Sequence, residues 1–197
     1  MSDLRRFWPA WLDDGLRDGL ETAYSVSSRG YHDLRHLSEV LEHVDALLPP
    51  GDPARESVLL AAWFHDAVYD GRGEDEERSA RLAEDAVPDP VLAAEVGRLV
   101  RLTATHRPAD DDHAGQVLCD ADLAILAADP ERYAAYTAGV RAEYAHVADP
   151  DFAAGRAGVL EDLLAKPTLF HTDQARRRWE TTARENLHRE VSTLRSR

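Results

Sequence analysis

Hydrophobic residues recur at three- and four-residue spacing along almost the whole chain. Alternating apolar and polar runs rich in β-branched residues and aromatics, which are typical of strands, are missing. The pattern therefore predicts an all-α fold, a helical bundle of about eight or nine helices. The predicted helices cover residues 9–24, 33–48, 53–69, 75–86, 90–105, 116–127, 130–145, 150–165 and 173–194.

Aspartate before proline punctuates this pattern at four places, namely Asp52-Pro53, Asp89-Pro90, Asp129-Pro130 and Asp149-Pro150. An aspartate accepts hydrogen bonds from the first backbone N–H groups of a helix, and proline is tolerated in the first turn because its missing N–H has no helical partner. Each pair therefore predicts a helix start with the aspartate as N-cap.

The segment Val58–Phe64 is apolar on every side, which in a globular protein indicates a helix surrounded by other helices. His65 and Asp66 follow it directly, and Asp70-Gly71 ends the predicted helix. A carboxylate at this position is desolvated and meets the negative end of the helix dipole. We therefore expect a positive group beside Asp66.

Length and composition indicate one globular domain over residues 1–197, with 44% hydrophobic and 30% charged side chains. The 37 acidic against 23 basic residues give a net charge of −14, which argues against a nucleic-acid polymer as partner. Cys119 is the only cysteine, so no internal disulfide forms. No apolar run is long enough to span a membrane, and we expect a soluble cytoplasmic protein, either monomer or homodimer.

Several polar residues project toward the apolar faces of their predicted helices when 100° is allowed per residue. Asp122 falls inside the apolar arc of its helix, whereas Asp120 projects almost oppositely and is the poorer candidate for a buried ligand. His36 lies at the edge of its apolar arc, with His32 one turn earlier as the rival. His106 ends the apolar seam of its helix.

Imidazoles and carboxylates on inward faces near helix ends form a mixed nitrogen and oxygen ligand set. Such a set suits a divalent cation (Mn, Mg, Zn, Co, Ni or Fe), and a cation would also neutralise the buried carboxylates. The sequence does not distinguish between these metals.

These residues resemble the HD superfamily of metal-dependent phosphohydrolases, in which an isolated His, a His-Asp pair and a later Asp recur. Here they are His36, His65-Asp66 and Asp122. The chain is also similar, over nearly its whole length, to a bacterial family of predicted metal-dependent HD phosphohydrolases. The shared segments are Arg29–Asp33, Glu76–Ala80, Thr103–His106, Arg141–Tyr144, Gly155-Arg156 and Ala183–Leu187. One departure is Asp33, where many relatives are expected to carry Asn.

The resemblance implies an HD-type helical bundle that hydrolyses a phosphoester or phosphoanhydride of a nucleotide or small phosphorylated metabolite. Four residues would hold the metal: His36, His65, Asp66 and Asp122. Asp66 would also orient or deprotonate the attacking water, because a ligand carboxylate keeps a second oxygen for the proton. His106 would bind a second metal, bind phosphate or protonate the leaving oxygen.

Phosphate recognition favours arginine, because its planar guanidinium matches pairs of phosphate oxygens. Arg29, Arg141 and Arg156 are the candidates, since they lie in the segments shared with the family. Glu77 is a candidate acid behind the ligands. Two other functions stay open. One is a di-iron oxygenase of the same fold, which needs more metal ligands than the four named here, and the other is a non-catalytic regulatory module, which would lack some of these four ligands.

Overall fold

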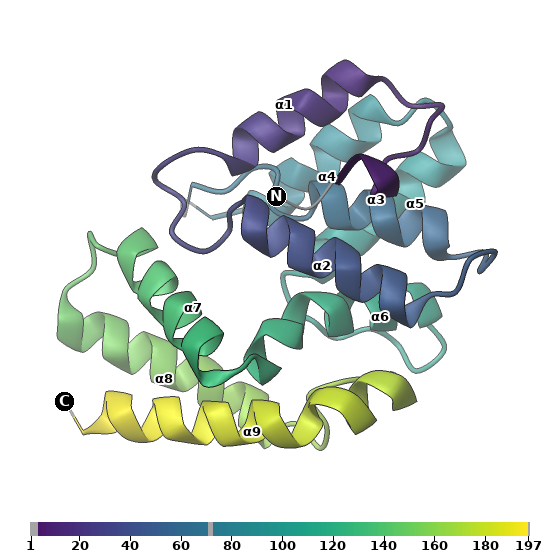
Figure 1. The fold of residues 1–197 in the computed structure, drawn as a ribbon. Helices are drawn as coiled ribbons and strands as arrows, with labels where there is room; N and C mark the ends of the chain where they lie inside the picture. The colour runs from purple at the N-terminus through teal and green to yellow at the C-terminus, as the bar shows by residue number, and fades with distance from the viewer. Residues whose placement is uncertain (1–3, 71–72, 197) are drawn as a thin grey trace. The chain divides into compact units, whose positions relative to one another are not determined.

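A computed structural model, which describes residues 4–70 and 73–196, confirms the all-α class, with no strand among these residues (Figure 1). The described elements are η1 (Leu4–Phe7), α1 (Asp14–Tyr24), α2 (Leu34–Leu47), α3 (Arg55–Phe64), α4 (Asp75–Ala86), α5 (Pro90–Leu102), α6 (His113–Leu123), η2 (Ala124–Ala127), α7 (Pro130–Glu143), α8 (Asp149–Ala165) and α9 (Asp173–Arg195). Here η denotes a 3₁₀ helix. None of these described helices combines the length and apolar character needed to cross a membrane.

The four Asp-Pro pairs all lie at or near helix starts, but not all aspartates act as caps. Asp89 and Asp129 cap α5 and α7 as predicted, each accepting two backbone N–H groups. Asp52 instead caps the turn before α3, which begins two residues later than predicted. Asp149 is the first residue of α8, and its carboxylate binds Arg141 rather than the helix backbone.

Several predicted helices are longer than the observed ones, including 90–105, since α5 ends at Leu102, whereas α6 begins earlier than predicted, at His113. Residues 9–13 precede α1, which begins after the N-cap Asp13 accepts the N–H of Leu16. Residues 65–69 lie beyond α3, where side chains elsewhere in the chain take over backbone groups; the hydroxyl of Ser79, for example, accepts the N–H of Val68. Residues 124–127, predicted as the end of an α-helix, form the 3₁₀ helix η2.

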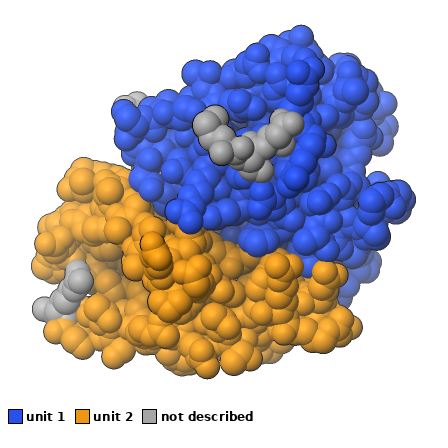
Figure 2. Space-filling model, in the orientation of Figure 1, with its two compact units in different colours: residues 1–122 blue, residues 123–197 orange. Residues whose placement is uncertain are grey.

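The chain divides into two compact units, residues 1–122 and 123–197 (Figure 2). In the first unit α3 packs against α2, α4 and α5, and α4 packs along α5. Every residue of Val58–Phe64 except Leu59 is buried, which agrees with the predicted central helix. The expectation of one domain over residues 1–197 stays a prediction, and each unit is described by itself.

The second unit consists of η2, α7, α8 and α9, with α9 packed against η2 and α8. The buried Asn186 of α9 donates from its side-chain amide to the carbonyls of Leu126 and Ala128, which fixes the end of η2. Arg156 of α8 and Glu190 of α9 form an ion pair with little exposure. Polar contacts as well as apolar packing therefore join the helices of this unit.

Candidate metal centre

The first ligand candidate, His36, lies in the first turn of α2. Asp33 caps this helix, and its carboxylate accepts the N–H groups of Arg35 and His36. The ring of Tyr31 lies 4.6 Å from that of His36, centroid to centroid, and His36 is only 1% exposed. The imidazole is therefore fully inside the unit, deeper than the edge position that the helix pattern predicts.

His65 and Asp66 lie directly after the last residue of α3. The Nδ1 atom of His65 is 2.8 Å from the carbonyl oxygen of Ala62, to which it donates. This hydrogen bond places the proton on Nδ1 and leaves the lone pair of a neutral imidazole on Nε2, which is the form that binds a metal. His65 is 1% exposed, so its Nε2 points into the interior of the unit.

Donor atoms of His36, His65 and Asp66 gather in one group, all within 4.8 Å of one another. His36 Nε2 is 3.0 Å from His65 Nε2 and 3.3 Å from Asp66 Oδ2, and His65 Nε2 is 3.0 Å from Asp66 Oδ2. Metal bonds of about 2.1 Å would place two ligand atoms about 3.0 Å apart at right angles and about 3.4 Å apart in a tetrahedron. These three residues therefore fit a divalent cation.

Asp122, near the C-terminal end of α6, reaches the same two imidazoles. Its Oδ1 is 3.2 Å from His36 Nε2 and 3.7 Å from His65 Nε2. Its other oxygen, Oδ2, is 2.8 Å from Nε2 of His106. Asp122 lies outside the group of three, so its part as fourth ligand depends on its contacts with the histidines and stays a prediction.

His106 follows the end of α5 in a left-handed conformation, with φ of 49°. Such a conformation is unfavourable for a residue with a Cβ atom, and it recurs at functional sites where the surroundings enforce it. Here it accompanies the hydrogen bond to Asp122. The imidazole therefore fixes one carboxylate oxygen of Asp122 while the other faces His36.

The pKa values in this cluster follow from opposite charges at close range. Burial alone would lower the pKa of His36, but its hydrogen bonds with Asp122 and Asp66 raise it to about 10. Burial likewise opposes the charged form of His65, and the charge of Asp66 outweighs it and raises that pKa. Burial opposes the charged forms of Asp66 and Asp122, yet the neighbouring histidines hold both pKa values below their usual range.

The structure places His36 and its rival His32 differently with respect to His65. His36, not His32, faces His65 Nε2. The ring of His32 instead stacks on that of Tyr69, with centroids 4.0 Å apart. His32 nevertheless lies close enough to help lower the pKa of Asp66. His32 therefore lies at the border of the cluster, on the side of Asp66.

The expectation that Asp120 points away from the core is wrong, because Asp120 is fully buried. The four successive residues Val117–Asp120 are all buried, so α6 is enclosed on several sides and its helical projection cannot separate inside from outside. The role of Glu77 as an acid behind the ligands stays a prediction. Hydrogen bonds from Arg101 and Arg81 engage it and lower its pKa to about 2.

The three arginines proposed to bind substrate all bind groups of the chain itself. Arg29 donates to backbone carbonyls beside the cluster. Arg141 donates to two carbonyls and to Asp149 within the second unit, where Arg156 pairs with Glu190. Their assignment to phosphate recognition stays a prediction.

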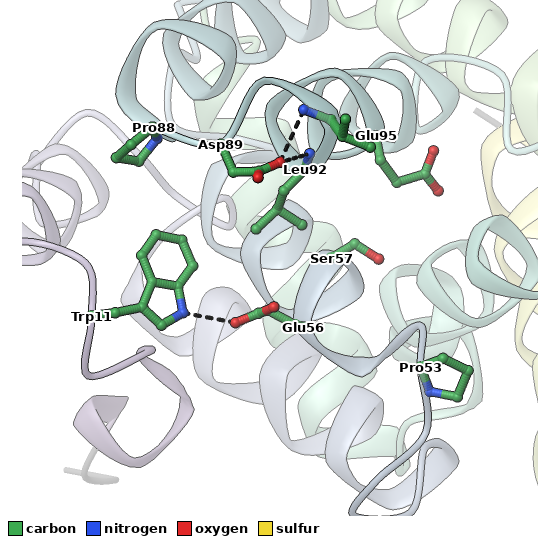
Figure 3. A pocket seen from close by; sticks show the side chains of 9 residues that line it. Trp11, Pro53, Glu56, Ser57, Pro88, Asp89, Leu92 and Glu95 are labelled. Atoms are coloured by element: carbon green, nitrogen blue, oxygen red, sulfur yellow. Dashed lines mark hydrogen bonds between the residues drawn. The ribbon is translucent and has the colours of Figure 1, made fainter.

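A surface pocket of the first unit lies away from the cluster (Figure 3). Its lining residues Glu56 and Leu92 are at the N-terminal ends of α3 and α5, whereas His65 and His106 follow the C-terminal ends of the same helices. The ten residues of α3 span about 15 Å. Because of this separation, the pocket adds no group to the centre. The carboxylate of Glu56 accepts a hydrogen bond from the indole N–H of Trp11.

The candidate metal centre thus consists of His36, His65 and Asp66, with Asp122 and His106 extending it from α6 and from the turn after α5. Comparison of the chain with protein-family models, with curated proteins and with solved structures finds no match in any of the three.

Proposed function

We propose that this protein is a metal-dependent phosphohydrolase that cleaves a phosphoester or phosphoanhydride of a small phosphorylated molecule. The observation that carries the proposal is the convergence of His36 Nε2, His65 Nε2 and Asp66 Oδ2, at separations of 3.0 to 3.3 Å. The resemblance of these residues to the HD pattern supplies the reaction class. A bound divalent cation would supply Lewis acidity, which lowers the pKa of a water molecule and neutralises phosphoryl oxygens.

The chain's own residues have separate roles in this proposal. His36 and His65 hold the cation through Nε2, and the Nδ1 hydrogen bond to Ala62 keeps His65 in the required tautomer. Asp66 is both ligand and proton acceptor: Oδ2 faces the histidines, and its second oxygen would take the proton of the attacking water.

Asp122 and His106, which extend the centre, have a third role. Asp122 would balance the second positive charge of the cation. His106 fixes the orientation of the Asp122 carboxylate through its hydrogen bond to Oδ2. The side chains of Asp66 and Asp122 are each 14% exposed, so the substrate would approach from the carboxylate side. The two imidazoles are buried and shielded from water.

The test combines metal binding with turnover. Purified protein is titrated with Mn²⁺, Mg²⁺, Co²⁺ and Ni²⁺ and is then assayed with each metal against a panel of phosphomonoesters, phosphodiesters and nucleotides. We expect saturable binding of at least one metal and phosphate release that depends on it. Asp66→Asn should abolish turnover while leaving the helical circular dichroism signal intact.

Glu84→Gln is the matched control. Glu84 is an acid of the same unit that is paired with Arg101 outside the cluster, so its variant should retain turnover. Full activity of Asp66→Asn would refute the assigned role. Iron retention with oxygen consumption, and no phosphate release, would instead favour the di-iron oxygenase.

A further inference from the structure

Arg29 makes three hydrogen bonds to backbone carbonyls next to the candidate ligands. Its Nη1 donates to the carbonyl of His32 at 2.9 Å and to that of Asp66 at 2.7 Å, and its Nη2 donates to that of Ala67 at 3.0 Å. From these contacts we infer that Arg29 is a positioning residue, which sets the spacing of the metal ligands through their backbone. This inference rests on the proposed metal centre.

The three carbonyls belong to two segments that carry different ligands. Asp66 and Ala67 follow α3, whereas His32 directly precedes Asp33, the N-cap that binds the N–H of His36. One guanidinium thus connects the start of the helix that carries His36 with the turn that carries Asp66. The separation of 3.3 Å between His36 Nε2 and Asp66 Oδ2 depends on how these two segments are held.

The backbone of Asp66 is held on both sides. Its carbonyl accepts from Arg29, and its N–H donates to the hydroxyl of the buried Tyr24, which itself donates to the carbonyl of Trp63. Asp66 lies beyond the last residue of α3, so side chains take the place of the regular helical hydrogen bonds there. Movement of Asp66 relative to His36 would therefore break these contacts first.

Arginine suits this position for two physical reasons. Carbonyls that follow a helix C-terminus carry partial negative charge, which favours a cation. Three bonds to carbonyls in different directions need the planar, multiply donating guanidinium, which the ammonium of lysine does not reproduce. The guanidinium also lies 4.9 Å from the ring centroid of Tyr24, a contact that fixes its plane.

The experiment measures Mn²⁺ affinity by calorimetric titration for the full chain and for Arg29→Ala and Arg29→Lys. All titrations are made well below the unfolding temperature of each protein. Loss of a group that holds a ligand weakens metal binding by about 10- to 100-fold, and we expect this for Arg29→Ala. Arg29→Lys keeps the charge and the aliphatic stem, so it should fold as the wild type does and still bind Mn²⁺ about 10-fold more weakly.

Arg184→Ala is the matched control. Arg184 also donates to three backbone carbonyls, those of Leu164, Lys166 and Pro167, but it lies in the second unit. Its loss should leave Mn²⁺ affinity unchanged. Hydrogen exchange adds a readout that needs no metal, and it should rise at residues 62–69 in Arg29→Ala and stay unchanged there in Arg184→Ala.

Each outcome decides the inference. If the wild type binds Mn²⁺ and both Arg29 variants bind it equally well, Arg29 does not position the ligands, and the metal centre itself stands. That result would also return Arg29 to the substrate role expected from the sequence. A wild type that binds no metal would overturn the centre and this inference together. Should Arg29→Ala fail to fold, the affinity of Arg29→Lys decides.

Discussion

Replacement of Asp122 by Asn tests whether the carboxylate of α6 is a metal ligand. The change preserves the shape of the side chain but removes one of two negative charges that would balance a divalent cation next to His36 and His65. We expect the metal affinity to fall by about 100-fold, which corresponds to about 2.7 kcal/mol. The reason is the loss of an anionic oxygen that lies 3.2 Å from His36 Nε2.

The size of the effect follows from linkage between metal binding and unfolding. At a Mn²⁺ concentration about 100 times the wild-type Kd, binding stabilises the wild type by about 2.7 kcal/mol. The variant, at roughly its own Kd, gains only about 0.4 kcal/mol. For a chain of this length about 1 kcal/mol shifts Tm by roughly 2–4 °C, so the wild type should gain about 5–10 °C and Asp122→Asn about 1–2 °C.

Asp120→Asn is the control for this measurement. Asp120 lies in the same helix and is fully buried, whereas Asp122 is the residue whose Oδ1 lies 3.2 Å from His36 Nε2 and 3.7 Å from His65 Nε2. Its variant should keep the full Mn²⁺-dependent rise in Tm, whatever its stability without metal. An equal rise in Asp122→Asn and the wild type, measured by differential scanning calorimetry, would show that Asp122 is not a ligand.

Two further predictions concern protons and backbone strain. The pKa values of His36 and His65 are both raised, so the stability that their protonated forms contribute without metal is complete below about pH 6.5. For His36, whose pKa is about 10, this stability is lost as the pH rises toward 10. Metal must displace these protons, so Tm in EDTA should fall over this interval while the Mn²⁺-induced rise in Tm grows. If Tm in EDTA and Tm in Mn²⁺ change in parallel across this pH range, the prediction is wrong. His106→Ala and His106→Gly both lose the bond to Asp122 and should bind Mn²⁺ about 10- to 100-fold more weakly than the wild type. Glycine adopts a left-handed conformation without strain, so His106→Gly should be about 1 kcal/mol more stable than His106→Ala. Equal denaturation midpoints of the two variants would show that the backbone at this position is not strained.

The sequence predicts what depends on local pattern. Helical periodicity is enough for the all-α class, and the apolar run Val58–Phe64 correctly identifies the central buried helix. The sequence predicts His36 and His65 as ligands of one metal, and the structure places their Nε2 atoms 3.0 Å apart. A buried imidazole or carboxylate needs a partner, and that need is readable without a structure.

What depends on tertiary packing could not be predicted in the same way. Burial of Asp120 arises because α6 is enclosed on several sides, which no helical projection of a single segment reveals. The end of α3 at Phe64 depends on distant side chains such as Ser79, which satisfies the backbone beyond it. The carbonyl contacts of Arg29 involve residues 37 and 38 positions away, and the local sequence carries no signal for them.

Unequal shielding around the cluster has a consequence for the order of events at the proposed centre. His36 and His65 are buried, and the partly exposed groups are the carboxylates of Asp66 and Asp122 together with His106, on a chain whose net charge is −14. The two carboxylates would repel an incoming phosphate, and a bound divalent cation would offset that repulsion. The cation would therefore bind before the anion, because its two positive charges offset the two carboxylates.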